Sequence, residues 1–178
     1  MTDAALGRSA SWAEADRSRR IIVGIGELAV ADRPGDVIVT YALGSCVAVC
    51  LFDRTAHVAA MLHFLLPESG INSRRAIEQP AAFGDTGIPM LLQAASQRGL
   101  RKNRATVRLV GGAEVANNPG GPLATGHRNV LAARSVLWRH GLFIESQDVG
   151  GVSARTVHLA VADGRLQIFN GREQIKEM

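Results

Sequence analysis

The apolar residues of this chain occur mostly in short runs, and residues that favour turns separate most of these runs. Helical spacing of apolar residues occurs only over 80–98 and 126–140, and each of these segments is followed by a glycine that favours helix termination. The expected strands cover residues 21–30, 37–43, 46–52, 57–66, 106–110, 143–149, 155–161 and 166–169. Strands outnumber helices, which predicts an α+β domain with helices packed on a mixed, largely antiparallel sheet.

Two of the most apolar runs flank the short polar connection 53–56, which has the length that β-hairpins use. If Phe52 faces His57 across this turn, counting six residues away from the turn along each strand places Cys46 opposite His63. Directly opposed residues of an antiparallel pair have Cβ atoms about 4.5–5.5 Å apart. The pattern therefore predicts a thiol and an imidazole side by side, as a nucleophile and its base require.

The two cysteines have different surroundings in the sequence. Cys50 lies inside an apolar run, where cysteine is an ordinary small hydrophobic residue. Cys46 follows Gly44 and Ser45, where the backbone can approach a ligand closely and leave N–H groups free for an oxyanion. Four positions apart on one strand, the two residues are separated by about 13 Å, too far for a disulfide. Both are expected to be free thiols, and Cys46 is the candidate nucleophile.

Other residues near this run have an ordinary interpretation and a functional one. In the ordinary interpretation Thr40 is a β-branched strand residue. In the functional interpretation it orients the imidazole through its hydroxyl or carbonyl. The glycine pairs 111–112 and 150–151 are turns, or they line a narrow entry for an extended side chain. The polar segment 67–79 is expected to be a loop long enough to border a site.

Composition narrows the possible functions. A chain of 178 residues fits one domain over 20–178 with a flexible tail over 1–19, and it has neither a membrane-length apolar run nor a signal-peptide pattern. A cytoplasmic location is the default expectation. The net charge of +4 is compatible with an acidic partner, but recognition motifs for nucleic acid are missing, so no nucleic acid is expected.

No cofactor or metal is expected either. The segment 24–29 matches the dinucleotide pattern G-x-G-x-x-A, but Pro34 and Gly35 follow too soon for the helix that such a site needs. The five histidines show no zinc-binding spacing, and two cysteines cannot build a cysteine-rich site.

Several motifs together resemble the chemoreceptor glutamine deamidases of bacterial chemotaxis, the CheD family. They are Gly24–Glu27, Thr40, Leu43–Val49, Met61–His63, Leu66–Pro67, Asp85–Thr86, Gly111–Ala113, Gly126, Arg128–Val130, Asp148–Gly151 and Arg155. The resemblance covers about residues 20–170, and the spaced set is far more specific than any single motif. Residues 114–116 depart from the more hydrophobic stretch that the family usually has there, and position 127 is an unusual histidine.

Carried onto this sequence, the resemblance makes Cys46 the nucleophile, His63 the general base and Thr40 the residue that orients the histidine. Gly44 and Ser45 are the oxyanion candidates that the residue pattern itself indicates. It implies an αββα-type sandwich like that of the cytotoxic necrotizing factor deamidases. It also implies conversion of glutamines on chemoreceptor cytoplasmic helices to glutamates through a cysteine thioester. Some members hydrolyse receptor methyl esters, and many bind the phosphatase CheC.

Two other functions are compatible with the same residues. A cysteine peptidase shares the nucleophile and base but cuts the main chain. A non-catalytic adaptor would retain the site only as a groove that binds a receptor or phosphatase helix.

Overall fold

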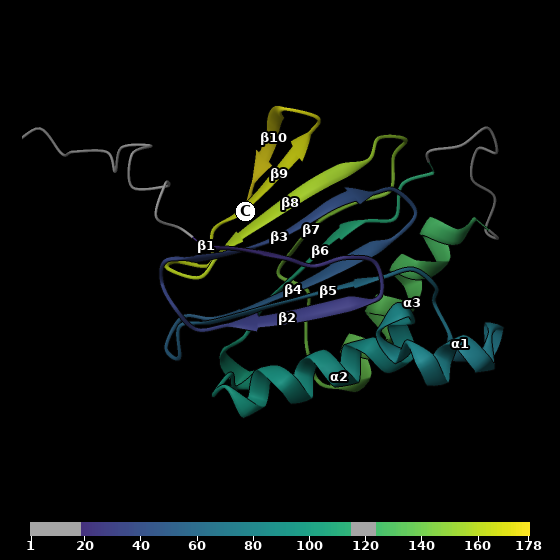
Figure 1. Ribbon diagram of the computed structural model, residues 1–178, viewed down its shortest axis with the longest axis horizontal. Helices are drawn as coiled ribbons and strands as arrows, with labels where there is room; N and C mark the ends of the chain where they lie inside the picture. The colour runs from purple at the N-terminus through teal and green to yellow at the C-terminus, as the bar shows by residue number, and fades with distance from the viewer. Residues whose placement is uncertain (1–18, 115–123) are drawn as a thin grey trace, which may run out of the picture.

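The computed structural model describes residues 19–114 and 124–178, which form two stacked β-sheets with helices against one of them (Figure 1). The first sheet has the strand order β1 (Arg19–Ile22), β3 (Asp36–Leu43), β8 (Arg155–Ala160), β9 (Leu166–Asn170) and β10 (Glu173–Glu177). The second has the order β2 (Glu27–Ala31), β5 (Val58–Phe64), β4 (Val47–Asp53), β6 (Thr106–Gly111) and β7 (Ser146–Val149). The helices are α1 (Ser73–Glu78), α2 (Gly84–Gln97) and α3 (Thr125–Arg139).

The continuous apolar runs of β4 and β5 follow from their place at the centre of the second sheet. Every residue of both strands is buried, because one face packs on the first sheet and the other on the helices. Along β4, Val47, Val49 and Leu51 belong to the core under the helices. Ala48 and Cys50 belong to the core between the sheets. This alternation is the two-residue period of a strand whose two faces are both covered.

The α+β class and the mixed, largely antiparallel pairing are confirmed, with β1–β3 and β6–β7 as the parallel pairs. Helices α2 and α3 contact strands of the second sheet, so the described layers run helices, second sheet, first sheet (Figure 1). A helical layer over the outer face of the first sheet, which an αββα order implies, is not among the described residues. No helix in the described part of the chain is long and apolar enough to cross a bilayer.

Two expectations about elements are corrected, and one strand was missed. The strand expected over 21–30 is two strands in different sheets, because the chain turns at Gly26, where φ is +77°. Residues 67–79 are not all loop, since Asn72 accepts a hydrogen bond from the N–H of Arg75 and starts α1. Strand β10 was not predicted, because all its residues are exposed and leave no apolar alternation to detect. Of the expected tail, Arg19 begins β1, and residues 1–18 lie outside the described residues.

The β4–β5 hairpin forms, but with a register two residues away from the expected one. Asp53 pairs with Val58, and Ala48 rather than Cys46 lies opposite His63. Asp53 stays in the strand because its carboxylate accepts the N–H groups of Thr55 and Ala56, and His57, with φ of +51°, belongs to the turn. A shift of two preserves the face on which each side chain lies, so Cys46 remains on the same face as His63.

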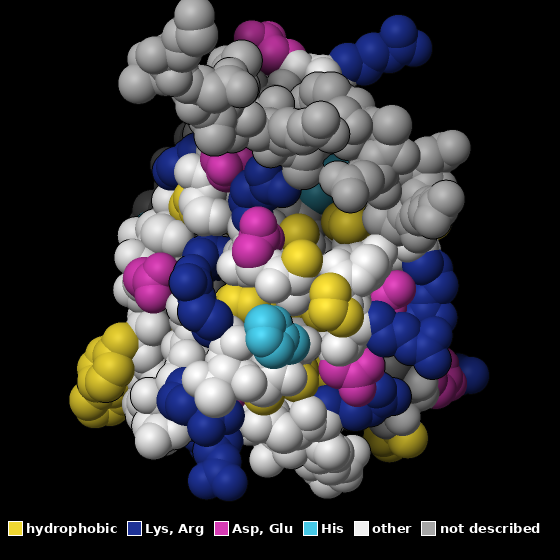
Figure 2. Space-filling model, turned by 90° about the vertical axis from the view of Figure 1, so that its left-hand side faces the viewer, with side chains coloured by type: hydrophobic (Ala, Val, Ile, Leu, Met, Phe, Trp, Pro, Cys, Tyr) yellow, Lys and Arg dark blue, Asp and Glu magenta, His cyan; other side chains and the backbone are white. Residues whose placement is uncertain are grey.

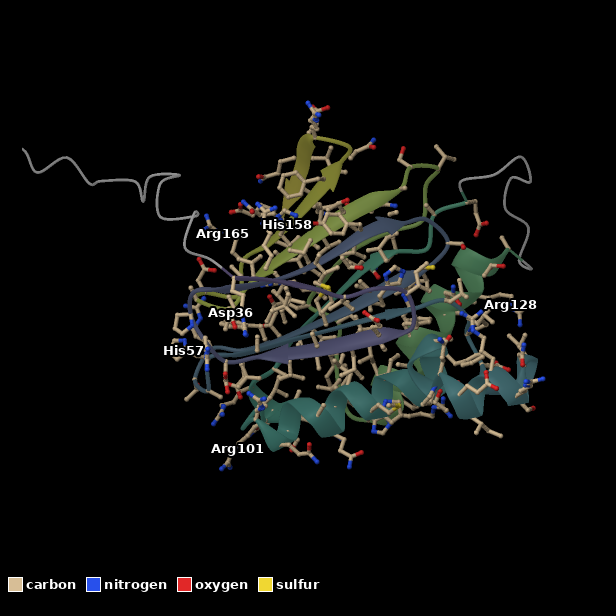
Figure 3. The ribbon with its side chains drawn as sticks, in the orientation of Figure 1. Asp36, His57, Arg101, Arg128, His158 and Arg165 are labelled. Atoms are coloured by element: carbon tan, nitrogen blue, oxygen red, sulfur yellow. The ribbon has the colours of Figure 1, made fainter. Side chains whose placement is uncertain are left out.

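Side chains of both charges are mixed at the end of the molecule that carries this turn, as Figure 2 shows. Arg104 pairs with Asp53 at 2.8 Å, and Arg98 pairs with Asp32 at 3.0 Å. Burial raises the pKa of Asp53, but the guanidinium of Arg104 and three backbone N–H groups outweigh it and hold the pKa at about 2. Arg98 and Arg104 are therefore engaged within the fold. His57 and Arg101 mark the same end in Figure 3.

Candidate functional site

The expected site residues lie at the opposite end, where β3 leaves the first sheet and β4 enters the second. The pairing of β3 with β8 shifts register between Thr40 and Leu43, and Ala42 takes a φ of +55°. The chain then passes through Gly44 and Ser45 to Cys46, just before β4 begins. Bulges and left-handed residues of this kind often mark the places where a fold directs a functional side chain.

Backbone hydrogen bonds fix the segment 44–46. The N–H of Gly112 donates to the Cys46 carbonyl at 2.7 Å, and the N–H of Ala113 donates to the Gly44 carbonyl at 2.8 Å. A Cβ atom on Gly111 would lie 2.3 Å from the Cys46 carbonyl oxygen, and Gly111 has a φ of +114°. Only glycine fits there. The 111–112 pair thus holds the Cys46 backbone in place rather than forming a simple turn.

The carbonyls of the segment 44–46 accept hydrogen bonds, whereas its first two N–H groups donate none within the described residues. Neither the N–H of Gly44 nor that of Ser45 has a hydrogen-bond acceptor among the residues that the structure describes. Free N–H groups beside a thiol are suited to stabilise negative charge on an oxygen. This arrangement agrees with the oxyanion role expected for Gly44 and Ser45.

Asn129 of α3 connects the two halves of the site. Its amide nitrogen donates to the Ser45 carbonyl at 2.8 Å and to the Leu65 carbonyl at 2.9 Å. Ser45 precedes Cys46, and Leu65 follows the strand that carries His63, so one side chain sets the spacing of both segments. Sequence reasoning gave Asn129 no role. The available signal was a polar residue on the buried face of an amphipathic helix, beside Gly126, Val130 and Ala133.

His63 of the second sheet meets Thr40 of the first. The Thr40 hydroxyl donates to the Val23 carbonyl at 2.7 Å, and its oxygen lies 2.8 Å from Nδ1 of His63. Since the single hydroxyl proton is used on Val23, the oxygen must accept a proton from Nδ1–H. This bond fixes the tautomer and leaves Nε2 as the unprotonated nitrogen. Nε2 is buried and has no hydrogen-bond partner among the described residues.

Cys46 lies on the same face as this imidazole, one strand position diagonally from it. His63 pairs with Ala48, which is two residues beyond Cys46. Diagonal positions of this kind are typically about 7–8 Å apart, with side chains that can approach more closely. Cys46 is only 6% exposed and His63 only 1% exposed, so both reactive groups are shielded from water. The structure thus joins Thr40 and His63 by a hydrogen bond and places Cys46 on the same face, diagonally from His63.

Burial determines the charge states of both groups. It raises the pKa of the Cys46 thiol, and a hydrogen bond from the residue's own N–H opposes this only in part. Burial lowers the pKa of His63 to about 4, although the Val23 carbonyl and the charge of Glu27 act in the opposite direction. The resting pair is therefore a neutral thiol beside a neutral imidazole. A thiolate–imidazolium pair, in which His63 would lower the thiol pKa, does not agree with these shifts.

We expect iodoacetamide to alkylate Cys46 faster as the pH rises, with a midpoint above the value of about 8.5 that a free cysteine shows. The reason is that burial raises the thiol pKa. Peptide mass mapping of samples quenched over a pH series measures this rate. Cys50 is the internal reference, because it is fully buried with a pKa raised to about 12. A rate for Cys46 that is already constant in mildly acidic solution would indicate a thiolate–imidazolium pair and contradict the expectation.

No group of three or more His, Cys, Asp and Glu residues within the described ranges is arranged to hold a metal ion.

Comparison with known proteins gives consistent matches. The family described as CheD chemotactic sensory transduction matches residues 65–170. The chain is 39% identical over 156 residues to a probable chemoreceptor glutamine deamidase CheD of Solibacter usitatus, covering 87% of this chain and 92% of that protein. It is 41% identical over 151 residues to a probable chemoreceptor glutamine deamidase CheD 2 of Anaeromyxobacter dehalogenans, covering 85% and 94%.

A third similar protein is the chemoreceptor glutamine deamidase CheD of Thermotoga maritima, at 37% identity over 157 residues. That match covers 87% of this chain and 96% of the relative. Thr40, Cys46 and His63 precede the range of the family match. The match to the Thermotoga maritima relative covers 87% of this chain, so it cannot begin after residue 63 and includes the segment 40–63.

Proposed function

The chain belongs to the CheD family of chemotactic sensory transduction proteins, and we propose that it deamidates glutamine side chains of chemoreceptors with Cys46 as nucleophile. The relatives named above are chemoreceptor glutamine deamidases, which supports a hydrolase acting on receptor amides. Receptor cytoplasmic helices are the proposed substrates, and the bacterial cytoplasm is the proposed location.

One observation carries the proposal. His63 has its Nδ1 proton committed to Thr40 and its Nε2 buried without a partner, on the face where Cys46 lies. A buried, unprotonated nitrogen next to a neutral thiol is what general-base activation of a cysteine requires. In an ordinary core, a histidine in this position would have both nitrogens satisfied.

The cycle begins when Nε2 of His63 takes the proton of the Cys46 thiol. The sulfur then forms a bond to the carboxamide carbon of glutamine, and the N–H groups of Gly44 and Ser45 stabilise the oxyanion. His63 returns the proton to the nitrogen, the C–N bond breaks, and ammonia leaves a thioester on Cys46. His63 next takes a proton from water, whose oxygen attacks the thioester carbon. The C–S bond breaks, the thiol regains its proton, and glutamate is released.

Thr40 serves as a positioning residue in this cycle. When His63 becomes an imidazolium, its Nδ1–H keeps donating to the Thr40 oxygen, so the ring does not have to reorient between steps. Hydrolysis of a glutamate methyl ester follows the same cycle with methanol in place of ammonia, and we include it in the proposal. Binding of a CheC-type phosphatase stays a prediction of the family resemblance. In the segment 114–116, where the sequence differs from that usual in the family, only Glu114 is among the described residues.

Intact-mass spectrometry of a soluble chemoreceptor cytoplasmic fragment incubated with the full chain tests the function. We expect the fragment to gain the mass difference between an amide and an acid at each target glutamine, with stoichiometric release of ammonia. Shortened fragments would indicate a peptidase instead. An unchanged fragment that nevertheless binds the protein would favour the adaptor and contradict the proposed activity.

A further inference from the structure

The outward side of α3 carries features that the proposed chemistry does not use. Its sequence contains Arg128, Arg134 and Arg139 and no acidic residue. Two large apolar side chains are also exposed there: Leu131 is 47% and Trp138 is 70% exposed. They are seven residues apart, so they lie on the same side of the helix, two turns from each other. Exposed tryptophan beside arginine is typical of protein interfaces.

These arginines are not engaged in the way that others in the protein are. Arg19, Arg98, Arg104 and Arg155 each form an ion pair at 3.0 Å or less. Within residues 19–114 and 124–178, no carboxylate lies within ion-pair distance of the arginines of α3, and Arg134 donates only to the amide of Gln147. Their charges are thus available to an external anion.

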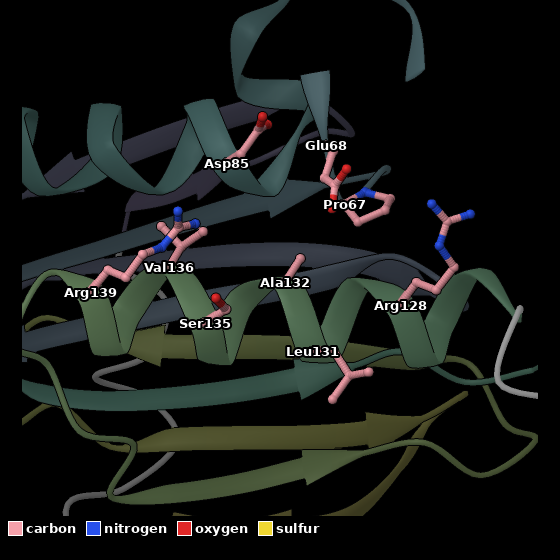
Figure 4. Close-up of a pocket in the computed structure, with 9 residues that line it drawn as sticks. All are labelled: Pro67, Glu68, Asp85, Arg128, Leu131, Ala132, Ser135, Val136 and Arg139. Atoms are coloured by element: carbon pink, nitrogen blue, oxygen red, sulfur yellow. The ribbon is translucent and has the colours of Figure 1, made fainter. Parts of the chain in front are cut away.

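A cleft of about 300 Å³ runs along the same helix (Figure 4). One wall is α3, with Arg128 and Arg139 at the two ends and Leu131, Ala132, Ser135 and Val136 between them. The other wall includes Pro67, Glu68 and Asp85. The carboxylate of Asp85 is already occupied, because it accepts hydrogen bonds from the N–H and the hydroxyl of Ser69.

The helix that lines the cleft also packs against the segment that carries the candidate site. Asn129, the neighbour of Arg128, holds the carbonyls of Ser45 and Leu65. Pro67, which lines the cleft, is two residues beyond Leu65. A polypeptide segment that presents a side chain to Cys46 therefore has α3 beside it.

We propose that this cleft and the outward side of α3 dock an acidic amphipathic helix of the substrate, which holds the target glutamine at Cys46. The inference rests on the proposed function and names the surface that selects its substrate. Arg128 and Arg139 are eleven residues apart, a rise of about 16 Å, so they match carboxylates about three turns apart on a partner helix. Leu131 and Trp138 meet the apolar positions of the same partner. Arg134, which lies between Leu131 and Trp138 in the sequence of α3, adds a third positive charge.

The test measures binding and kinetics with the soluble receptor cytoplasmic fragment. We expect Arg139→Glu and Trp138→Ala each to weaken fragment binding and to raise KM by about tenfold, with kcat unchanged. The effect of Arg139→Glu is expected to shrink at high salt, because it is electrostatic. Arg101→Glu is the matched control: it changes an exposed arginine at the opposite end (Figure 3) and should leave both quantities unchanged. Cys46 alkylation should be the same in all variants.

The outcomes separate this inference from the proposed function. If the wild type deamidates the fragment and neither variant changes affinity or KM, the docking surface is wrong. If the wild type binds the fragment without deamidating it, and Arg139→Glu weakens that binding, the docking surface stands and the proposed chemistry fails. Loss of binding to phosphatidylglycerol vesicles, with unchanged affinity for the fragment, would assign the surface to a membrane and overturn the inference.

Discussion

Cys46→Ala is expected to lower receptor deamidation by at least about 10⁴-fold, because no other group at the site can form the thioester. Cys50→Ala is the matched control, since Cys50 is also buried and lies four residues further along the chain, in the core between the sheets. We expect it to retain activity and to lose only about 1 kcal/mol of unfolding free energy. Ammonia release and the mass shift of the receptor fragment measure the activity of both variants.

The two substitutions separate chemistry from packing. Cys46 is held by its backbone carbonyl through Gly112, and alanine keeps that hydrogen bond. Thermal unfolding should therefore show a folded Cys46→Ala protein. Undiminished deamidation by this variant would remove Cys46 as nucleophile and with it the proposed mechanism. Loss of activity in Cys50→Ala, with the fold intact, would transfer the assignment to the other thiol.

His63→Gln is expected to lower kcat by about 10³-fold, because general-base catalysis typically contributes 10²- to 10⁴-fold. Thr40→Val is expected to have a smaller effect, of about 10- to 100-fold, since it leaves the imidazole in place but removes the acceptor of its Nδ1 proton. Thr40→Ser keeps the hydroxyl and should restore most of the activity. This rescue distinguishes orientation of the ring from a purely structural role of the threonine.

The pH dependence of kcat/KM gives a second measure of the same group. Catalysis needs neutral His63, whose pKa is lowered to about 4, so the rate should stay constant down to about pH 5 and fall only through pH 4. An unperturbed histidine would cause the fall near about pH 6.5. An acid limb at that higher value would show that the base is another group or that His63 is exposed.

Stability must be followed in the same experiment. The folded pKa of His63 lies below its unfolded value, so the unfolded chain binds the proton first as the pH falls. The unfolding free energy should therefore decrease between about pH 6.5 and 4, by about 3 kcal/mol from this residue. Urea unfolding at several pH values measures this decrease, and His63→Gln should reduce it. Rates are compared only where both proteins remain folded.

Hydrophobic patterning predicted the elements that carry the site, because local spacing alone determines them. The apolar runs of β4 and β5, the turn between them and the helices α2 and α3 all follow from it. The face shared by Cys46 and His63 was also correct, because a two-residue register error does not change the side on which a strand residue lies. The register itself depended on the carboxylate of Asp53, which also binds Arg104 from another segment.

What the sequence by itself determined is the chemistry available and its approximate place: a thiol after Gly44 and Ser45, and a histidine on the neighbouring strand. Only the tertiary structure decided how these groups are set. The hydrogen bond between Thr40 and His63 joins two different sheets, and Asn129 reaches Ser45 from a helix 84 positions away in the chain. Such contacts depend on how sheets and helices stack over a common core, and no periodicity within a segment encodes that stacking.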